Sequence, residues 1–497
     1  RRGGSLLTLA DAASGQIAVR RFACAEPRGL AWDPAADTVH VACTGGELVT
    51  FRAAGGDAIR TLHLDRDLRD VIVSGGQLLV TRFRSSEILT VDAQGAIVSR
   101  ATPPPVLRFG GPVPLGSPSM APEAVAEVAW RTIQLPDGRL VMSHQRQLPR
   151  MLNSKDQGGY GGSCDSSPVE SAVSVMQPGQ APVAVDAIAR GALPVDIAAS
   201  RTGDKLAVVL AGQKTVTVVD TARATTLPDM ERCRGMDGDD DDDDDDQGDD
   251  LGTPTSTAFA NNGDLVVFYP EKPALVVRVA AGSSKRLIAL PGDRSLDRGR
   301  AIFHTQTLIG LACASCHPEG REDGRVWSFA ELGSRRTQSL AGNLLERAPF
   351  HWGGDMASLD VLMDDVFSQR MVGGPVDAHA KVALGAWLDR IPAPAPGSIA
   401  DTAAVARGQA VFEAAACGTC HNGDLLTNNQ LVNVGTGAKF KVPSLLGIGA
   451  RAPYMHTGCA KTLTERFGPC GGGDTHGLTS NLTQAQIADL VAFLESL

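Results

Sequence analysis

The chain has 497 residues, of which 43% are hydrophobic and 21% charged, and its formal net charge is −10. This length exceeds what a single hydrophobic core usually organises, so we expect several domains. The acidic balance disfavours nucleic acid as a partner, because phosphate binding needs a concentrated basic surface, and no apolar run approaches the roughly 18 residues of a membrane span.

Residues 1–290 are expected to be all-β. They contain short apolar, β-branched runs separated by Gly, Asp and Asn turns. The clearest runs are residues 37–41, 77–81, 139–142, 205–210, 215–220 and 264–268. A unit of strand, polar turn and strand returns about every 40 residues, the period of a β-propeller blade, so about seven blades would fit. A pair of packed β-sheets is the alternative.

Residues 193–220, which read LPVDIAASRTGDKLAVVLAGQKTVTVVD, resemble a repeat of the YVTN or quinoprotein-like propeller families. The resemblance implies a propeller that docks or recognises a partner. Within the same region, residues 237–250 (DGDDDDDDDDQGDD) are almost unbroken aspartate and cannot form a packed core. We expect a solvated, disordered loop there; the run lacks the spaced ligands of a defined Ca²⁺ loop, so calcium binding is the lesser alternative.

Near residue 290 the pattern changes to amphipathic helices. Residues 295–307 and 402–416 each read as such a helix, and each leads into a Cys-x-x-Cys-His sequence. The Pro-rich stretch 391–398 (IPAPAPGS) excludes regular structure and marks a boundary. We therefore predict two mainly α domains, residues 291–396 and 397–497, the second ending in a capped amphipathic helix over 483–497.

The two Cys-x-x-Cys-His sequences are the strongest chemical signal in the chain. They comprise Cys313, Cys316 and His317 in the first copy and Cys417, Cys420 and His421 in the second. Cysteines at this spacing add to the vinyl groups of haem, and the adjacent histidine ligates the iron. Because a disulfide or zinc pair followed twice by a chance histidine is a poor alternative, the sequence predicts two covalently bound haem c groups.

Six further cysteines remain, and an even remainder suggests disulfides. Proximity along the chain favours the pairs Cys24–Cys43, Cys164–Cys233 and Cys459–Cys470. Disulfides and thioether-bound haem both indicate an oxidising compartment, so we expect a periplasmic or cell-surface protein. The chain begins without an apolar signal core, and we expect that an export signal has been removed.

The sixth iron ligand decides whether each haem transfers electrons or reacts with small molecules. After the first haem the nearest candidate is His351, with Met356 and Met371 behind it, so an open or exchangeable site is expected. After the second haem the candidates are His476, Met455 and, as a phenolate, Tyr454. We favour His476, which lies in a glycine-rich loop that a Cys459–Cys470 bridge would hold.

Residues 291–497 resemble the bacterial di-haem cytochrome c peroxidase superfamily, which includes the methylamine-utilisation di-haem enzymes. The segments that carry the resemblance are LACASCHPEGREDG (311–324), RRTQSL (335–340), APFHWGGD (348–355), VGTGAKFKVPSLLGIGARAPYMHTG (434–458) and DLVAFLESL (489–497). The resemblance implies that the first haem reacts with peroxide and that the second relays electrons. It also implies that Trp352 lies between the two haems.

Some features of that family have no clear counterpart here. The glutamine and glutamate that assist peroxide cleavage are missing, and the nearest acids are Asp364 and Asp365. Arg336 and Arg451 stand where the family binds an inter-domain Ca²⁺, and two cations argue against that ion.

Three functions follow from these observations. The first is a di-haem oxidoreductase of peroxidase type, which takes electrons from a small donor such as a cytochrome c or a cupredoxin and reduces peroxide. The second is a non-catalytic electron-transfer protein with a propeller for docking. The third is a quinoprotein-like or otherwise catalytic propeller whose electrons are removed by the haem domain. It ranks last because residues 1–290 contain no recognisable cofactor site.

Overall fold

The computed structural model describes residues 4–11, 16–107, 123–161, 167–177, 183–187, 191–224, 251–280, 282, 284–396 and 401–497. The expected Cys164–Cys233 bridge and the aspartate-rich segment 237–250 lie outside these residues. The chain divides into two compact units: Arg1–Leu148 with Ser167–Leu296, and Pro149–Ser166 with Asp297–Leu497. The last boundary between the units lies at Leu296 and Asp297. The three expected domains, with bounds near residues 290 and 396, stay predictions. The assignment of Pro149–Ser166 to the second unit was not indicated by the sequence.

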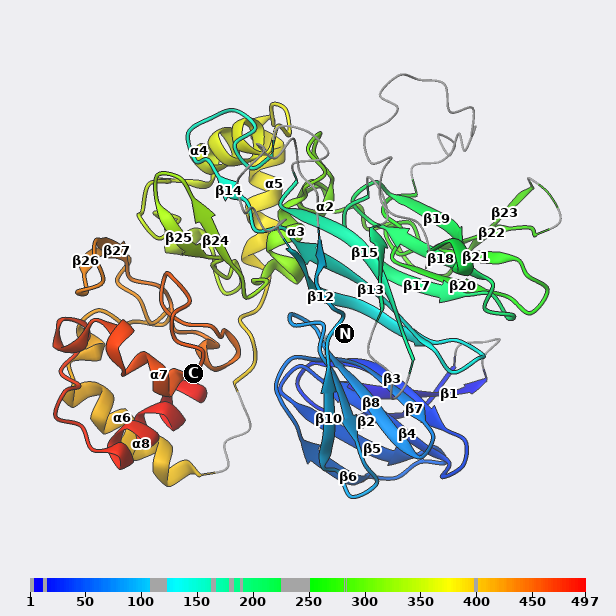
Figure 1. The fold of residues 1–497 in the computed structure, drawn as a ribbon, viewed down its shortest axis with the longest axis horizontal. Helices are drawn as coiled ribbons and strands as arrows, with labels where there is room; N and C mark the ends of the chain where they lie inside the picture. The colour runs from blue at the N-terminus through cyan, green and yellow to red at the C-terminus, as the bar shows by residue number, and fades with distance from the viewer. Residues whose placement is uncertain are drawn as a thin grey trace, which may run out of the picture. The chain divides into compact units, whose positions relative to one another are not determined.

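The first unit consists of antiparallel sheets (Figure 1). In chain order they are formed by β1 (Ser5–Asp11) and β2 (Gln16–Phe22); by β3 (Pro27–Asp33), β4 (Thr38–Cys43), β5 (Glu47–Arg52) and β6 (Ala58–His63); by β7 (Leu68–Ser74), β8 (Gln77–Arg82), β9 (Ile88–Val91) and β10 (Ile97–Ala101); by β11 (Val106–Leu107), β12 (Glu123–Gln134), β13 (Leu140–Gln147), β15 (Val169–Met176) and β16 (Val183–Ala187); by β17 (Pro194–Ala199), β18 (Lys205–Leu210) and β19 (Thr215–Asp220); and by β20 (Ser256–Phe259), β21 (Leu265–Tyr269), β22 (Ala274–Arg278) and β23 (Lys285–Ala289). A single helical turn, α1 (Thr221–Ala224), follows β19.

Neighbouring sheets pack in a repeated way. Strand β3 lies beside β7, β7 beside β12, β12 beside β17, and β17 beside β20. Each core cluster is shared by two consecutive sheets, as where Leu48 and Leu68 meet, or where Val209 and Val267 meet. This packing agrees with an all-β region. The described part of the unit contains five sheets of three to five strands, so the number of about seven blades stays a prediction.

The second unit is largely helical and irregular. Its elements are β14 (Met151–Leu152), α2 (Arg298–His304), α3 (Cys313–Cys316), η2 (Pro318–Gly320), β24 (Val326–Phe329), β25 (Gly333–Arg336), η3 (Leu345–Arg347), α4 (Leu359–Leu362), the π-helix η4 (Met363–Arg370), α5 (Ala378–Asp389), α6 (Thr402–Ala414), η5 (Cys417–Thr419), β26 (Leu431–Asn433), β27 (Lys439–Lys441), η6 (Ile448–Ala450), α7 (Leu463–Arg466), η7 (Pro469–Gly471), η8 (Gly473–His476) and α8 (Gln484–Glu495). Residues 391–396 form neither helix nor strand, as their prolines predict. Among the described helices, none is both long and apolar enough to cross a bilayer.

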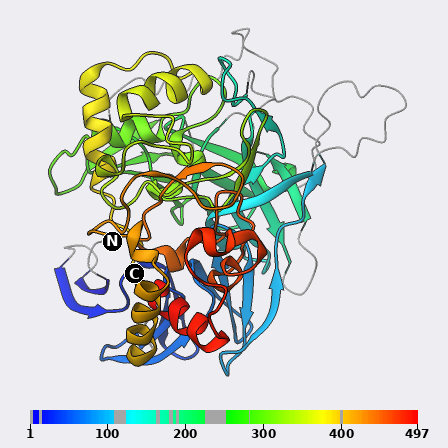
Figure 2. The same cartoon turned by 90° about the vertical axis from the view of Figure 1, so that its left-hand side faces the viewer.

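Two helix pairs repeat the same packing. Helices α6 and α8 lie side by side (Figure 2), and a Cβ added at Gly408 would lie 1.9 Å from the Asp489 carbonyl oxygen. Helices α2 and α5 pack in the same way, and a Cβ added at Gly299 would lie 2.2 Å from the Ala383 carbonyl oxygen. Because only glycine permits such close approach, each pair depends on one glycine at its crossing.

The segment 149–161 lies in the sequence between two stretches of the β-rich unit, but it packs within the second unit. Its strand β14 pairs in parallel with β24. Further along, the amide of Tyr160 donates to the Arg370 carbonyl at 3.2 Å, and the Tyr160 ring lies edge-on against Phe329. This docking brings Tyr160 to the first of the two Cys-x-x-Cys-His sites.

Candidate haem sites

The four cysteines of the Cys-x-x-Cys-His sequences form no disulfide in the part of the chain that the structure describes. Cys313 and Cys316 begin and end α3, and Cys417 begins η5, three residues before Cys420. The other cysteines within the described ranges form the disulfides Cys24–Cys43 and Cys459–Cys470, which confirms both predictions. Free, half-buried thiols beside a histidine suit thioether attachment of haem.

The two adjacent histidines are oriented in the same way. The Nδ1 atom of His317 donates to the Arg321 carbonyl at 3.1 Å, and Nδ1 of His421 donates to the Leu426 carbonyl at 3.2 Å. Each bond holds the proton on Nδ1 and leaves Nε2 with a free lone pair. Burial lowers the pKa of His317, and it lowers the pKa of His421 to about 4, so both rings are neutral and able to ligate iron.

His476 faces His421. The two ring centres are 6.5 Å apart with 35° between the planes, and Nδ1 of His476 donates to the Gly471 carbonyl at 3.1 Å. An imidazole nitrogen binds a metal ion at about 2 Å, so two axial imidazoles have ring centres about 6 Å apart. Burial lowers the pKa of His476 to about 3, which keeps its ring neutral. The ring spacing fits a haem iron, and His421 and His476 are the residues that would hold it.

The other candidates near the second site are placed differently. Tyr454 is 7% exposed and belongs to an apolar cluster with Phe412 and Leu490, which indicates a packing role. Met455 follows it in a turn, with φ of 69°, and is half-buried. The Cys459–Cys470 disulfide joins two residues that come shortly before the His476 loop in the sequence, as expected.

Around His317, no ring pair like that of His421 and His476 occurs in the part of the chain that the structure describes. His351 lies near enough that, after burial, its charge also lowers the pKa of His317. It adopts a left-handed conformation, with φ of 65°, and its Nδ1 pairs with Asp355 at 3.1 Å. The first site thus has a carboxylate-held imidazole nearby without a facing ring.

Tyr160 and Arg370 also belong to the first site, and the sequence did not indicate either. Burial raises the pKa of the Tyr160 phenol, while Arg370 opposes this and the charges of Cys316 and Asp355 add to it. Arg370 Nη1 donates to the phenol oxygen at 3.5 Å. Tyr160 was missed because it precedes Cys316 by more than 150 residues, inside a region that reads as β-strands.

Asp364 and Asp365 lie on η4 and do not meet His351. Asp364 is 66% exposed and pairs with Lys381 at 2.5 Å, while Asp365 pairs with Arg370. Asp355 stands beside His351 instead, four residues after it. Met356 and Met371 are buried, at 4% and 6% exposed.

Trp352 lies against residues that follow the second Cys-x-x-Cys-His sequence. Its Nε1 donates to the Arg336 carbonyl at 2.7 Å, and its carbonyl accepts from the Lys441 amide at 2.8 Å. Its ring is 6.2 Å from that of His456, which stacks on Phe440 at 3.9 Å. His456 was not singled out in the sequence, because only the fold brings it to Trp352.

Arg336 and Arg451 converge on Glu322. Their nitrogens lie 3.5 Å and 3.6 Å from its carboxylate, and all three side chains are buried. Within the described ranges, no group of three or more His, Cys, Asp or Glu side chains could hold a metal ion. The two guanidinium groups supply the positive charge beside Glu322.

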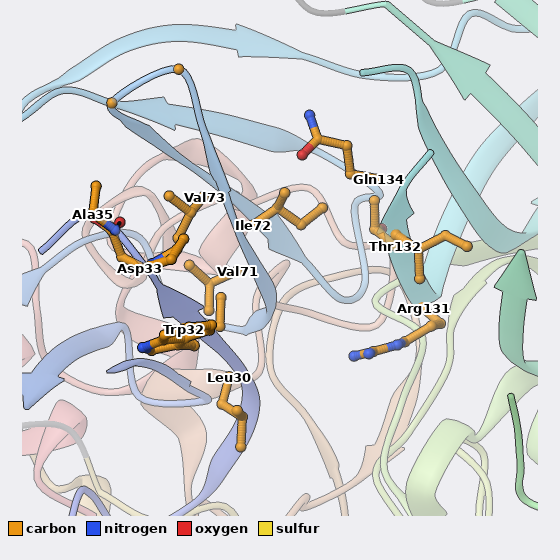
Figure 3. Close-up of a pocket in the computed structure, with 15 residues that line it drawn as sticks. Leu30, Trp32, Asp33, Ala35, Val71, Ile72, Val73, Arg131, Thr132 and Gln134 are labelled. Carbon is orange, nitrogen blue, oxygen red and sulfur yellow. Dashed lines mark hydrogen bonds between the residues drawn. The ribbon is translucent and has the colours of Figure 1, made fainter. Parts of the chain in front are cut away.

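The first unit has a cavity of about 540 Å³ between strands β3, β7 and β12 (Figure 3). Leu30, Trp32 and Val71 line one side, and the Arg131 side chain extends toward them from β12. A neighbouring cavity of about 730 Å³ shares Arg131, which pairs there with Asp70 at 2.6 Å and Asp196 at 3.7 Å. The pairing neutralises the one cation that both cavities share.

Comparison with known proteins gives partial matches. The cytochrome c family model matches residues 405–497. Hydrazine synthase subunit gamma of Kuenenia stuttgartiensis is 26% identical over 256 residues, covering 37% of this chain and 72% of that protein. The cytochrome-c peroxidase IdrP1 of Denitromonas iodatirespirans is 42% identical over 66 residues, covering 12% of this chain and 18% of that protein.

Among solved structures, a MauG-like protein associated with microbial copper homeostasis is 21% identical, with a TM-score of 0.33, and covers 42% of this chain and 91% of that one. The relatives in sequence include a protein named as a cytochrome-c peroxidase. Residues 405–497, which carry Cys417, Cys420, His421 and His476, are thus a cytochrome c domain, and such a domain implies covalently bound haem c and a haem redox function.

Proposed function

We propose that this protein is an exported di-haem oxidoreductase of cytochrome c peroxidase type, located in the periplasm or at the cell surface. The haem of His317 reduces peroxide, and the haem of His421 relays electrons from a small donor of the cytochrome c or cupredoxin type. The proposal rests chiefly on the different surroundings of two otherwise equivalent histidines. His421 faces His476, whereas no ring faces His317 in the described residues.

A second haem is supported by repetition within the second unit. Helices α2 and α6 share the sequence Arg-Gly-x-Ala-x-Phe, at residues 298–303 and 407–412. Their arginines pair with Asp377 and Asp489, and their phenylalanines contact Trp387 and Phe493. Both copies then lead to a Cys-x-x-Cys-His sequence whose histidine donates from Nδ1 to a carbonyl. Equal packing around equal donors favours the same cofactor in both.

The proposed chemistry needs a proton acceptor at the first site. Bound haem supplies the redox centre to which peroxide would bind. His351, held through Nδ1 by Asp355, can take a proton from the peroxide at Nε2 and return it to the departing oxygen. Arg370 and Tyr160 supply hydrogen-bond donors in the same region. Asp355 therefore takes the supporting role that the sequence assigned to Asp364 and Asp365.

Electron transfer between the two sites is proposed to involve Trp352. Its indole bonds to the backbone of Arg336 in the first module and contacts His456 of the second. Trp352, His456 and Phe440 thus form one aromatic group where the two modules meet, which supports the proposed role of Trp352.

A non-catalytic electron-transfer protein is the second candidate. The observation in its favour is that Asp355 pairs with Nδ1 of His351, because a carboxylate on one ring nitrogen is also the usual arrangement of a histidine that ligates a metal through the other. If His351 binds iron permanently, both haems are six-coordinate and peroxide has no place to bind.

The test is absorption and EPR spectroscopy of the purified protein, oxidised and half-reduced, after mass spectrometry has counted the attached haems. A high-spin population that binds cyanide and consumes peroxide is expected. Loss of peroxide turnover in His351→Ala, with Asp364→Asn unaffected, would support the role of His351. Two low-spin haems in every state, inert to peroxide, would leave the electron-transfer function; a single haem would refute the di-haem proposal.

A further inference from the structure

Four buried cations gather where the two repeats of the second unit meet. This basic cluster consists of Arg336, Arg347, Lys441 and Arg451, each 4–5% exposed. Two bonds join its members in pairs: Arg336 Nη2 donates to the Arg451 carbonyl at 2.5 Å, and Lys441 Nζ donates to the Arg347 carbonyl at 2.5 Å. Arg451 is in turn near enough to Arg347 to lower its pKa. The four side chains are therefore held in one region.

The carboxylates beside the basic cluster are too few to balance it. Glu322 pairs with Arg336 and Arg451. Asp323 is the second acid, and burial raises its pKa to about 6, so part of its charge is lost near neutral pH. Asp389 is a third carboxylate, near enough to raise the pKa of Arg347. Four cations thus face three carboxylates among the described residues, one of them partly protonated, and a surplus of positive charge remains.

Arg347 is the member of the basic cluster whose N–H groups are best placed to bind an anion. Its Nε and Nη2 atoms are buried, and neither has a hydrogen-bond partner among the described residues. Burial, followed by repulsion from Arg451, lowers the pKa of Arg347 to about 10. Burial and then Arg347 lower the pKa of Lys441 to about 8. Because an unpaired buried charge costs several kcal/mol, this arrangement calls for carboxylate or similar groups.

The basic cluster also borders both haem sites. His317 lies against the carbonyl of Gln338, two residues from Arg336. His421 lies against the carbonyl of Pro443, two residues from Lys441. The charge of Glu322 is near enough to raise the pKa of His317. An anionic group carried by a haem at either site would therefore be close to these cations.

We propose that the basic cluster binds the propionate carboxylates of haem c, with Arg347 as a main donor. A guanidinium group offers paired N–H donors that match a carboxylate in a bidentate bond. A propionate carboxylate would balance the surplus positive charge beside Arg347. The inference requires haem c but neither peroxidase activity nor a second haem, so it stands or falls separately from the proposed function.

The test uses the full haem-loaded protein and the variants Arg347→Gln and Lys441→Met. The haem propionates are labelled with ¹³C through a labelled biosynthetic precursor and followed by redox-difference infrared spectroscopy. Loss of a cation favours ferric over ferrous haem, because the ferric form carries more positive charge. We expect the ratio of ferrous to ferric haem at a fixed potential to fall about tenfold, a midpoint decrease of about 59 mV.

Arg347→Lys keeps the charge and should restore most of the midpoint. Arg407→Gln, which removes an exposed arginine of α6, is the matched control and should change neither the midpoint nor the labelled bands. If Arg347→Gln does not incorporate haem, infrared spectra of the labelled wild-type protein over a range of pH still test the inference. Labelled bands that stay ionised well below the ordinary carboxyl pKa of about 4.3 support the pairing, and bands that protonate near that value contradict it.

Two further results would overturn the inference. One is a set of labelled bands and midpoints that are unchanged in both variants. The other is a midpoint that depends on chloride or phosphate while the labelled bands do not respond to either substitution, since the cations would then hold an inorganic anion.

Discussion

At the scale of single residues, the identity of the ligand opposite His421 can be tested directly. His476 faces that ring at 6.5 Å, whereas Met455 is half-buried in a neighbouring turn. Replacing His476 with Met should raise the midpoint potential of the second haem, because methionine ligation favours the ferrous state. Potentiometric titration measures this. Met455→Leu is the control and should leave the midpoint unchanged; the reverse pattern would assign the ligand to Met455.

Asp323 should make the stability of the protein depend on pH. Burial raises its pKa to about 6, above the usual aspartate value, so the folded protein binds the proton more tightly than the unfolded chain. This penalty is absent below about pH 4 and grows as the pH rises through 6. We expect Asp323→Asn to raise the free energy of unfolding at pH 7.5 by on the order of 2 kcal/mol, and to have little effect near pH 4.

Denaturant unfolding of the wild-type and variant proteins at several pH values measures this difference. Two stability curves that run parallel across the whole range would show that Asp323 is not responsible.

Much of the haem attachment could be predicted at this scale, because covalent chemistry fixes Cys-x-x-Cys-His spacing within five residues. The residues opposite the first haem could not. Asp355, Tyr160 and Arg370 meet only after the chain has folded, and Asp364 and Asp365 were chosen by their nearness in sequence. His476, favoured as the ligand of the second haem, faces His421 in a loop that follows the Cys459–Cys470 disulfide, and its role as ligand stays a prediction.

At the scale of elements, each helix pair depends on one glycine. A methyl group at Gly408 would lie 1.9 Å from the Asp489 carbonyl oxygen, so α6 and α8 would have to separate. Gly408→Ala should therefore destabilise the protein by about 1–3 kcal/mol, despite the better helix propensity of alanine. Thermal unfolding measures the loss. Gln409→Ala, on the exposed side of the same helix, is the control; equal stability of the two variants would contradict the close packing.

The strands at residues 205–210 and 215–220 were predicted with their observed bounds, because β-branched runs between turn residues define both ends. The helix expected over 295–307 is shorter, at Arg298–His304. The Asp297 side chain accepts from the Arg300 amide at 3.0 Å and fixes the start, while Thr305 is extended and ends the helix. Apolar periodicity alone does not register such caps.

At the scale of the whole molecule, the properties proposed for the first haem depend on residues 149–161, which are far from it in sequence and include the turn that positions Tyr160. A Cβ at Gly159 would lie 2.0 Å from the Asn153 carbonyl oxygen, so Gly159→Ala should displace the turn that presents Tyr160. We expect altered cyanide binding and slower peroxide reduction at the first haem, with the spectrum of the second unchanged. Lys155→Ala, exposed in the same segment, is the control. Equal changes at both haems would indicate general loosening instead.

Long-range placement of this kind is the part of the architecture that the sequence could not indicate. The boundary near residue 290 is visible as a change in periodicity, but nothing in the composition of residues 149–161 separates them from the strands on either side. Their membership of the second unit depends on pairing with β24, almost two hundred residues later.

The chain consequently passes between its two units three times, near residues 148, 166 and 296. A protease that cut the chain near residue 296 would not separate the two fragments. The N-terminal fragment carries β14, which would remain paired with β24 of the C-terminal fragment. A gene fragment beginning at residue 297 would lack both that strand and Tyr160. Co-expression of residues 1–296 with such a fragment should restore it by complementation.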